Sequence, residues 1–134
     1  MSETRVVTTA SVVSAAVIDL VLVVVFVLIG RSSHDESSSA LGLLGTAWPF
    51  VAGAALGWLI MRAWRSPLAV VWTGIGIWIS TVVFGMLLRS AVDQGVQLSF
   101  VIVTFVVLGV FLLGWRGVAA LVTRLSGRRG RDAA

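Results

Sequence analysis

The chain has 134 residues, of which 58% are hydrophobic and 12% charged, with a formal net charge of +4. Soluble domains carry about 25% charged residues, and a small soluble domain leaves much of its surface in water. These values exclude a soluble fold and predict a protein embedded in lipid. The sequence has no cysteine, which excludes disulfides, thiolate metal sites and cysteine nucleophiles.

Four apolar stretches are each close to the length of about 20 residues that a helix needs to cross a membrane. We predict spans at 9–30, 43–61, 68–88 and 98–117. The remaining segments are an N-terminus (1–8), an outer loop (31–42), an inner connection (62–67), a second outer loop (89–97) and a basic tail (118–134). The predicted fold is an all-α bundle of four transmembrane helices.

Arginine supplies every positively charged side chain of the sequence and sets the predicted orientation. Only Arg31 and Arg89 lie at the ends of the spans opposite to the termini. The positive-inside rule therefore predicts that both termini are cytoplasmic. The last part of the tail, residues 126–134, is expected to be disordered and to lie at anionic lipid headgroups. Because the arginines flank apolar segments and do not line one helix face, nucleic-acid binding is not expected.

The sequence contains an internal similarity that predicts a duplicated helical hairpin. Phe26, Arg31, Ser32, Asp35 and Thr46 match Phe84, Arg89, Ser90, Asp93 and Thr104 at one offset, and Leu56–Trp58 match Leu113–Trp115 one deletion later. Both hairpins would begin and end inside, so the copies would be parallel, related by an axis along the membrane normal. At the same offset Asp19 corresponds to Ile77, so this carboxyl is not duplicated.

Gly53 and Gly57 form a GxxxG spacing in the second predicted span. Small residues at this spacing let two helices approach closely in lipid. We expect them to be a packing surface, either within the chain or between copies. A homo-oligomer and an assembly with other membrane subunits are both consistent with this surface.

Asp19 is the one ionisable residue in the interior of a predicted span, close to the bilayer midplane. A charge at this depth costs at least about 2.5 kcal/mol, so the side chain should face protein or water. No arginine is placed at a similar depth by the predicted spans. The expected partners are therefore Trp78, Ser80 and Thr81 on the third span, with Thr104 on the fourth as a weaker candidate.

Two hypotheses for Asp19 follow. A neutral carboxyl could join the first and third helices by hydrogen bonds, or it could gain and lose a proton in a small proton-coupled carrier. Dry contact with Trp78 or Ser80 would favour the structural role. A water-accessible cavity that reaches Asp19 between the first and third helices would favour transport.

The first outer loop carries Arg31, His34 and Asp35. His34 with adjacent acids could bind a divalent metal weakly, but consecutive residues of a loop rarely converge on one ion. Pairing of Arg31 with Asp35 at i, i+4 is the alternative. We expect no metal site and no cofactor. The sequence has no nucleophilic triad or phosphate-binding glycine loop, so an enzyme is not expected.

One residue and three segments resemble those of a known family: Asp19, Gly30–His34, Thr46–Phe50 and Leu113–Arg116. The family is the domain of unknown function 3054, a group of small four-helix prokaryotic membrane proteins. The resemblance covers nearly the whole chain except the basic tail. It implies a multi-pass protein of the prokaryotic plasma membrane and implies no activity. Function is therefore unknown, with a non-catalytic bundle or subunit of a larger membrane assembly as the first hypothesis and the carrier as the alternative.

Overall fold

The computed structural model describes residues 7–33 and 39–132, and the long elements of these segments are helices. Helix α1 covers Thr9–Ser33, α2 covers Ala40–Ile60, α3 covers Ile75–Ala91 and α4 covers Leu98–Asp132. A 3₁₀ turn (Ala63–Arg65) and a π-helical turn (Val70–Gly74) connect α2 to α3. Within these described segments, four helices are long and apolar enough to cross a membrane, with the π-helical turn included in the third. The predicted all-α class with four such helices is confirmed.

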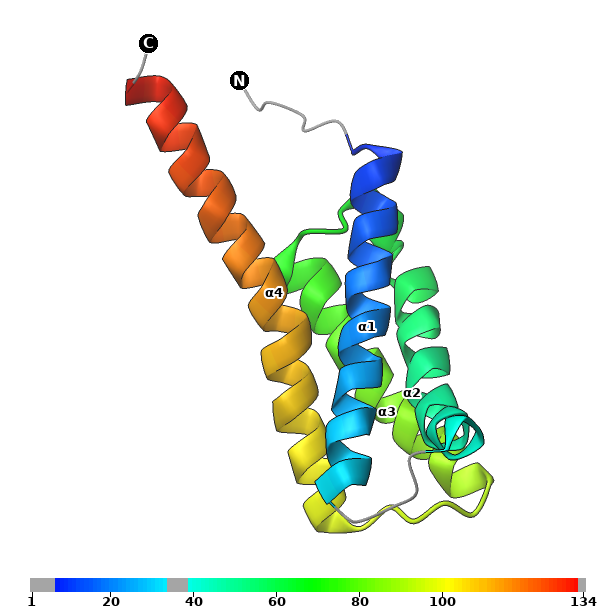
Figure 1. Cartoon of the computed structure of the whole chain (residues 1–134). Coiled ribbons are helices and arrows are strands. Elements are labelled where there is room, and N and C mark those ends of the chain that lie inside the picture. Colours follow the sequence, from blue (N-terminus) through cyan, green and yellow to red (C-terminus); the bar gives the residue numbers. More distant parts are fainter. Residues whose placement is uncertain (1–6, 34–38, 133–134) are drawn as a thin grey trace.

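The helices form a ring in which neighbours along the chain are also neighbours in space. α1 packs on α2, α2 on α3 and α3 on α4, and α4 closes the ring against α1. The α2–α3 connection lies toward the end of the bundle where α1 begins and α4 ends (Figure 1). α1 and α3 are therefore diagonally opposite, a relation that the sequence did not reveal.

The contact between α2 and α3 depends on the two glycines of the GxxxG spacing. A Cβ atom at Gly53 would lie 2.9 Å from the carbonyl oxygen of Thr81, and one at Gly57 would lie 2.9 Å from the Cβ of Ser80. The Ser80 hydroxyl donates a hydrogen bond of 2.9 Å to the Gly53 carbonyl. Both glycines thus lie at a contact within the chain, where the helix backbones approach closely.

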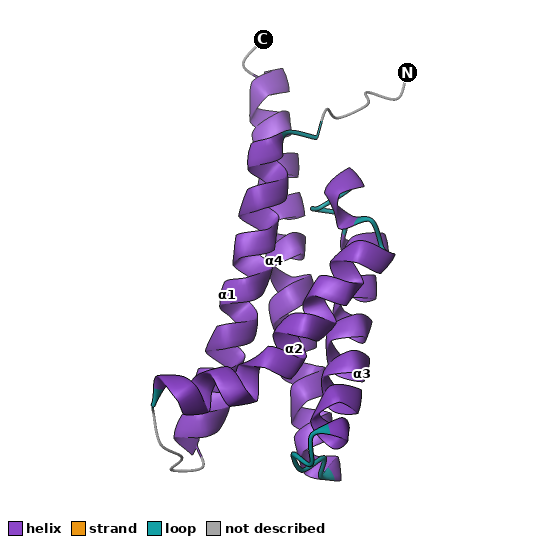
Figure 2. Cartoon of the chain, turned by 90° about the vertical axis from the view of Figure 1, so that its right-hand side faces the viewer, coloured by secondary structure: helices purple, strands orange, loops and turns teal. Residues whose placement is uncertain are grey.

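Helix α2 bends, and its first turns run at a steep angle to the remainder (Figure 2). Pro49 lies inside this helix, where it cannot donate to the carbonyl of Gly45, four residues earlier. The Gln94 side-chain amide, from the α3–α4 connection, donates to that carbonyl at 3.0 Å. Arg89 donates to the Gln94 side-chain oxygen at 2.9 Å. The carbonyl that proline releases is thereby satisfied from another part of the chain.

Helix α4 extends further than the predicted span. It continues to Asp132 as one helix, so the expected disordered tail is wrong for the described backbone. The segment after Gly117 contains alanine, leucine and arginine, which favour helix, and it contains no proline. The end of α4 and the start of α1 diverge from each other (Figure 1).

Replacing Gly57 with valine should push α2 away from α3, because the new side chain meets backbone and Cβ atoms of α3. We expect a loss of about 1–3 kcal/mol of stability, typical of overpacking, measured by thermal unfolding in detergent. Gly114→Val is the matched control, since a Cβ at Gly114 has no neighbour within 4 Å. Equal unfolding temperatures for the two variants would contradict the assignment.

Candidate functional site: a buried ion pair between α1 and α4

Asp19 lies on the buried stripe of α1. Ala15, Asp19 and Val23 follow one another at intervals of four residues, and Asp19 is only 1% exposed. This spacing places the three side chains on one face of the helix. The stripe faces inward, as predicted for a charged residue of an apolar helix.

Arg116 reaches Asp19 from α4. Thr104, Leu108, Leu112 and Arg116 form the equivalent buried row on that helix, and Arg116 has an exposed fraction of 0%. Its two terminal nitrogens donate to the two carboxylate oxygens at 2.8 and 2.7 Å. This bidentate arrangement is the strong form of an arginine–carboxylate pair.

Two further Arg116 donors anchor the guanidinium to the backbone. The Nε atom donates to the Pro67 carbonyl at 2.9 Å, and one terminal nitrogen also donates to the Leu112 carbonyl at 3.1 Å. Thr73 secures the connection beside Pro67 because its hydroxyl donates to the Ser66 carbonyl at 2.5 Å. The ion pair is therefore tied to the α2–α3 connection as well as to two helices.

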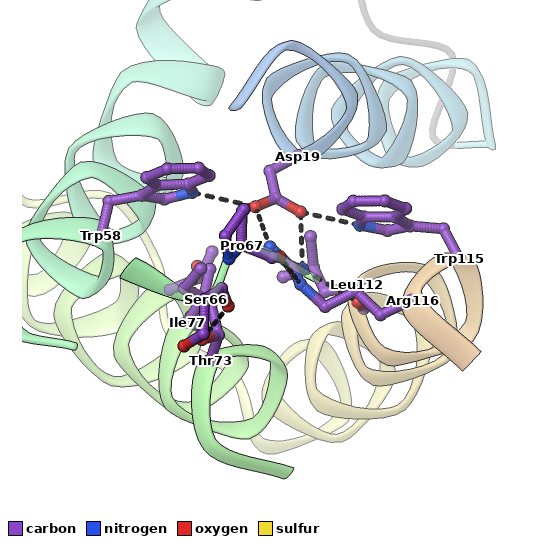
Figure 3. Close-up of polar contacts among 10 residues, drawn as sticks. Asp19, Trp58, Ser66, Pro67, Thr73, Ile77, Leu112, Trp115 and Arg116 are labelled. Atoms are coloured by element: carbon purple, nitrogen blue, oxygen red, sulfur yellow. Dashed lines mark hydrogen bonds and ion pairs between the residues drawn. The ribbon is translucent and has the colours of Figure 1, made fainter. Parts of the chain in front are cut away.

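Two tryptophans complete the environment of the carboxylate (Figure 3). The Trp58 indole nitrogen donates to Oδ2 of Asp19 at 2.9 Å, and the Trp115 indole nitrogen donates to Oδ1 at 2.9 Å. The Arg116 guanidinium also lies 4.6 Å from the centre of the Trp115 ring, a favourable cation–π distance. Each carboxylate oxygen thus accepts two N–H bonds, one from arginine and one from tryptophan.

The partners predicted for Asp19 are wrong. Trp78 donates to the Phe105 carbonyl, Ser80 to the Gly53 carbonyl and Thr81 to the Ile77 carbonyl within α3. These side chains belong to α3, which is diagonal to α1, whereas the true partners come from α2 and α4. Similar depth along two helices does not place them side by side.

Thr104, the weaker candidate, also does not bind Asp19. Its hydroxyl is buried without a hydrogen-bond partner among the described residues. It lies three turns before Arg116 on α4, or about 18 Å along the helix axis. The α4 side chain that reaches Asp19 is therefore Arg116, which lies near the α2–α3 connection.

Arg116 was missed because the predicted spans placed it in the cytoplasmic group of arginines. A helical side chain leans toward the N-terminus of its helix, so Arg116 reaches back into the bundle from the last turn of the predicted span. Its bond to Pro67 also places Asp19 close to the ends of α2 and α3 rather than halfway along the bundle. The available signal was the Trp115–Arg116 pair at the end of an otherwise apolar segment.

Arg31 and Arg89 lie at the end of the bundle opposite to the termini and contact neighbouring helices there. Arg31 donates to the Thr46 hydroxyl on α2 at 2.7 Å. Arg89 lies 4.6 Å from the centre of the Phe100 ring. His34 and Asp35 fall outside the described residues, so the predicted pairing of Arg31 with Asp35 stays a prediction. Within residues 7–33 and 39–132, no group of three His, Cys, Asp or Glu side chains could hold a metal ion.

A pocket of about 450 Å³ lies beside the ion pair. It is formed by α1 and α2, with Leu20 on one wall, Ala54 and Leu59 on the other, and Trp64 toward the α2–α3 connection. Asp19 contributes to the lining, but its oxygens are occupied by the bonds described above. The pocket is thus chiefly apolar, and it lies between α1 and α2 rather than between α1 and α3.

The model of the protein family of unknown function DUF3054 matches residues 16–119. The chain belongs to this family. The matched segment contains Asp19, Trp58, Trp115 and Arg116, so the whole ion-pair cluster lies inside the family domain. No curated protein and no solved structure matches the chain.

Replacing Arg116 with methionine leaves a buried carboxylate without its cation, and we expect a loss of about 3–5 kcal/mol of stability. The double variant D19N/R116M should recover at least half of this loss, because it leaves no buried charge. Unfolding of the purified protein in detergent measures both values.

Arg124→Met is the matched control, since Arg124 lies two turns later on α4 and is exposed. We expect this variant to stay within about 0.5 kcal/mol of the unchanged protein. A double variant that is no more stable than Arg116→Met would show that the ion pair is not the source of the loss.

Proposed function

We propose that the protein is a non-catalytic helical bundle that serves as a subunit of a larger membrane assembly, with Asp19 in a structural role. One observation carries the proposal: both oxygens of Asp19 are saturated by donors from Arg116, Trp58 and Trp115. A carboxylate in this state joins three helices and offers no free acceptor to a travelling proton.

The proton-coupled carrier is the weaker alternative. It would need a hydrated path to Asp19, and the pocket beside this residue has a chiefly apolar lining. A proton on Asp19 would also separate the pair and leave Arg116 as an uncompensated buried cation, which is costly. The cost of leaving Arg116 unpaired therefore favours a fixed ion pair over a carrier mechanism.

The hairpin duplication is part of the proposal, and the tryptophan contacts support it. Trp58 and Trp115 end the two Leu-Gly-Trp segments of the internal similarity, and their indoles bind the two oxygens of one carboxylate. Equivalent residues of the two hairpins would then meet at one point. Asp19 and Arg116 have no counterpart of the same residue type in the other hairpin.

We also propose that both termini are cytoplasmic and that the protein is in the plasma membrane of a prokaryote. Arg62 and Arg65 are exposed on the α2–α3 connection, at the end of the bundle where α1 begins. This concentration of arginine is what the positive-inside rule associates with the cytoplasmic side.

Cysteine labelling tests the orientation directly, because the chain has no cysteine of its own. A membrane-impermeant maleimide should label Val96→Cys in intact spheroplasts and should label Ser126→Cys only after permeabilisation. Both positions are exposed. The reverse pattern would overturn the proposed orientation.

The inner part of α4 supports membership of an assembly. Val118, Leu121, Val122 and Leu125 lie on one face of the helix and are each more than half exposed. If the exposed arginines of the α2–α3 connection mark the membrane boundary, this apolar row lies at or beyond the headgroups. A row of this kind needs a covering surface, and we propose that a partner helix provides it.

Replacing Leu121 with glutamate should disrupt this contact, because a charge in an apolar helix interface costs several kcal/mol. We expect the native molecular mass of the complex extracted in mild detergent to fall. Ala120→Glu is the matched control, since Ala120 is exposed on the opposite face of the same turn. It should leave the mass unchanged.

Two results would contradict the proposal. One is a monomer of this chain alone from the unchanged protein. The other is a flux driven by a pH gradient through the purified protein in liposomes that Asp19→Asn abolishes, which would favour the carrier.

A further inference from the structure

The pocket between α1 and α2, called here the α1–α2 groove, lies beside the ion pair and has no role in it. Ala16 and Leu20 of α1 and Ala54 and Ala55 of α2 contribute to its walls. The alanines are too short to close the space between the helices. The volume of about 450 Å³ lies within the range of about 300–1,000 Å³ that is usual for small-molecule sites.

The second hairpin fills the corresponding space with a side chain. Trp78 stands at the position equivalent to Leu20, 58 residues later. Its indole would lie 2.9 Å from a Cβ atom at Gly109 on α4, and its ring centre is 4.4 Å from that of Phe105. The indole nitrogen donates to the Phe105 carbonyl. Leucine at the equivalent position of the first hairpin leaves the α1–α2 groove open.

Two arginines flank, in the sequence, the residue that lines the groove near the α2–α3 connection. Trp64 lines the groove, and its sequence neighbourhood contains Arg62 and Arg65, which are both exposed. Arg62 has φ 51° and ψ 53°, a left-handed conformation that usually selects glycine. This residue follows Met61, which caps the end of α2, and the left-handed turn directs the chain from the helix into the connection.

We propose that the α1–α2 groove binds one acyl chain of an anionic phospholipid whose phosphate is held by Arg62 and Arg65. The apolar walls suit the chain. The two exposed arginines that flank Trp64 in the sequence suit the phosphate, which arginine binds through paired N–H donors. The acyl chain would lie in the first hairpin at the position equivalent to that of the Trp78 indole in the second. Lipid binding at this place does not depend on whether the protein joins a larger assembly.

Native mass spectrometry of the full chain in mild detergent tests the acyl-chain site. The probes are phosphatidylglycerol and phosphatidylcholine with identical chains. Leu20→Trp copies the residue of the second hairpin and should lower binding of one phosphatidylglycerol by about tenfold or more. Val21→Trp is the matched control, because Val21 is 51% exposed and does not line the groove. It should bind as the unchanged protein does.

Ala55→Leu is a second variant that fills the groove by a smaller change, and it should also weaken binding. Thermal unfolding of each variant without lipid shows whether it is folded. If folded Leu20→Trp and Ala55→Leu both bind phosphatidylglycerol as strongly as Val21→Trp does, the groove is not the site.

The headgroup part of the proposal needs its own variants. The double variant R62Q/R65Q should lower the preference for phosphatidylglycerol over phosphatidylcholine by about fivefold for each arginine. Arg124→Gln, an exposed arginine on α4, is the control and should keep the preference. An unchanged preference in R62Q/R65Q, or equal binding of the two lipids by the unchanged protein, would overturn the proposed headgroup site.

Discussion

The bidentate contact between Asp19 and Arg116 is the interaction on which the arrangement of the helices depends. It joins the first helix to the last, and the bond from Arg116 to the Pro67 carbonyl extends the contact to the connection between the other two. Helices in lipid gain little from hydrophobic exclusion, so polar contacts and close packing have to hold them together. The ion pair provides the polar contact, and the glycines between α2 and α3 provide the close packing. The two contacts lie on different sides of the ring.

The hydrogen bonds around the ion pair explain how it is tolerated among apolar helices. A buried ion pair loses the hydration of both charges and is stable only when its remaining donors and acceptors are satisfied. Trp58 and Trp115 supply the missing donors to the carboxylate, while the Leu112 and Pro67 carbonyls accept from the guanidinium. The cluster is therefore electrically neutral as a whole, and four of the five N–H donors of Arg116 have hydrogen-bond partners.

The sequence predicted the class of fold well, because apolar length and composition report directly on the membrane. It also identified Asp19 as the residue of interest, since one acid in a long apolar segment needs a partner. It did not reveal which helix supplies that partner. Depth can be counted along each helix, but the order of helices around a ring depends on packing, and packing placed α3 diagonally across from α1. The cation was missed for a related reason, because the length of the arginine side chain separates its charge from its Cα position.

The long separation of Asp19 and Arg116 along the chain has a consequence for biosynthesis. The two residues are 97 positions apart, so α1 is made and inserted well before the segment that neutralises it. Until α4 is inserted, the Asp19 carboxyl of α1 lacks its arginine partner. Closure of the ring is thus coupled to completion of the chain. A truncated chain that stops before Arg116 would leave the Asp19 carboxylate without its cation.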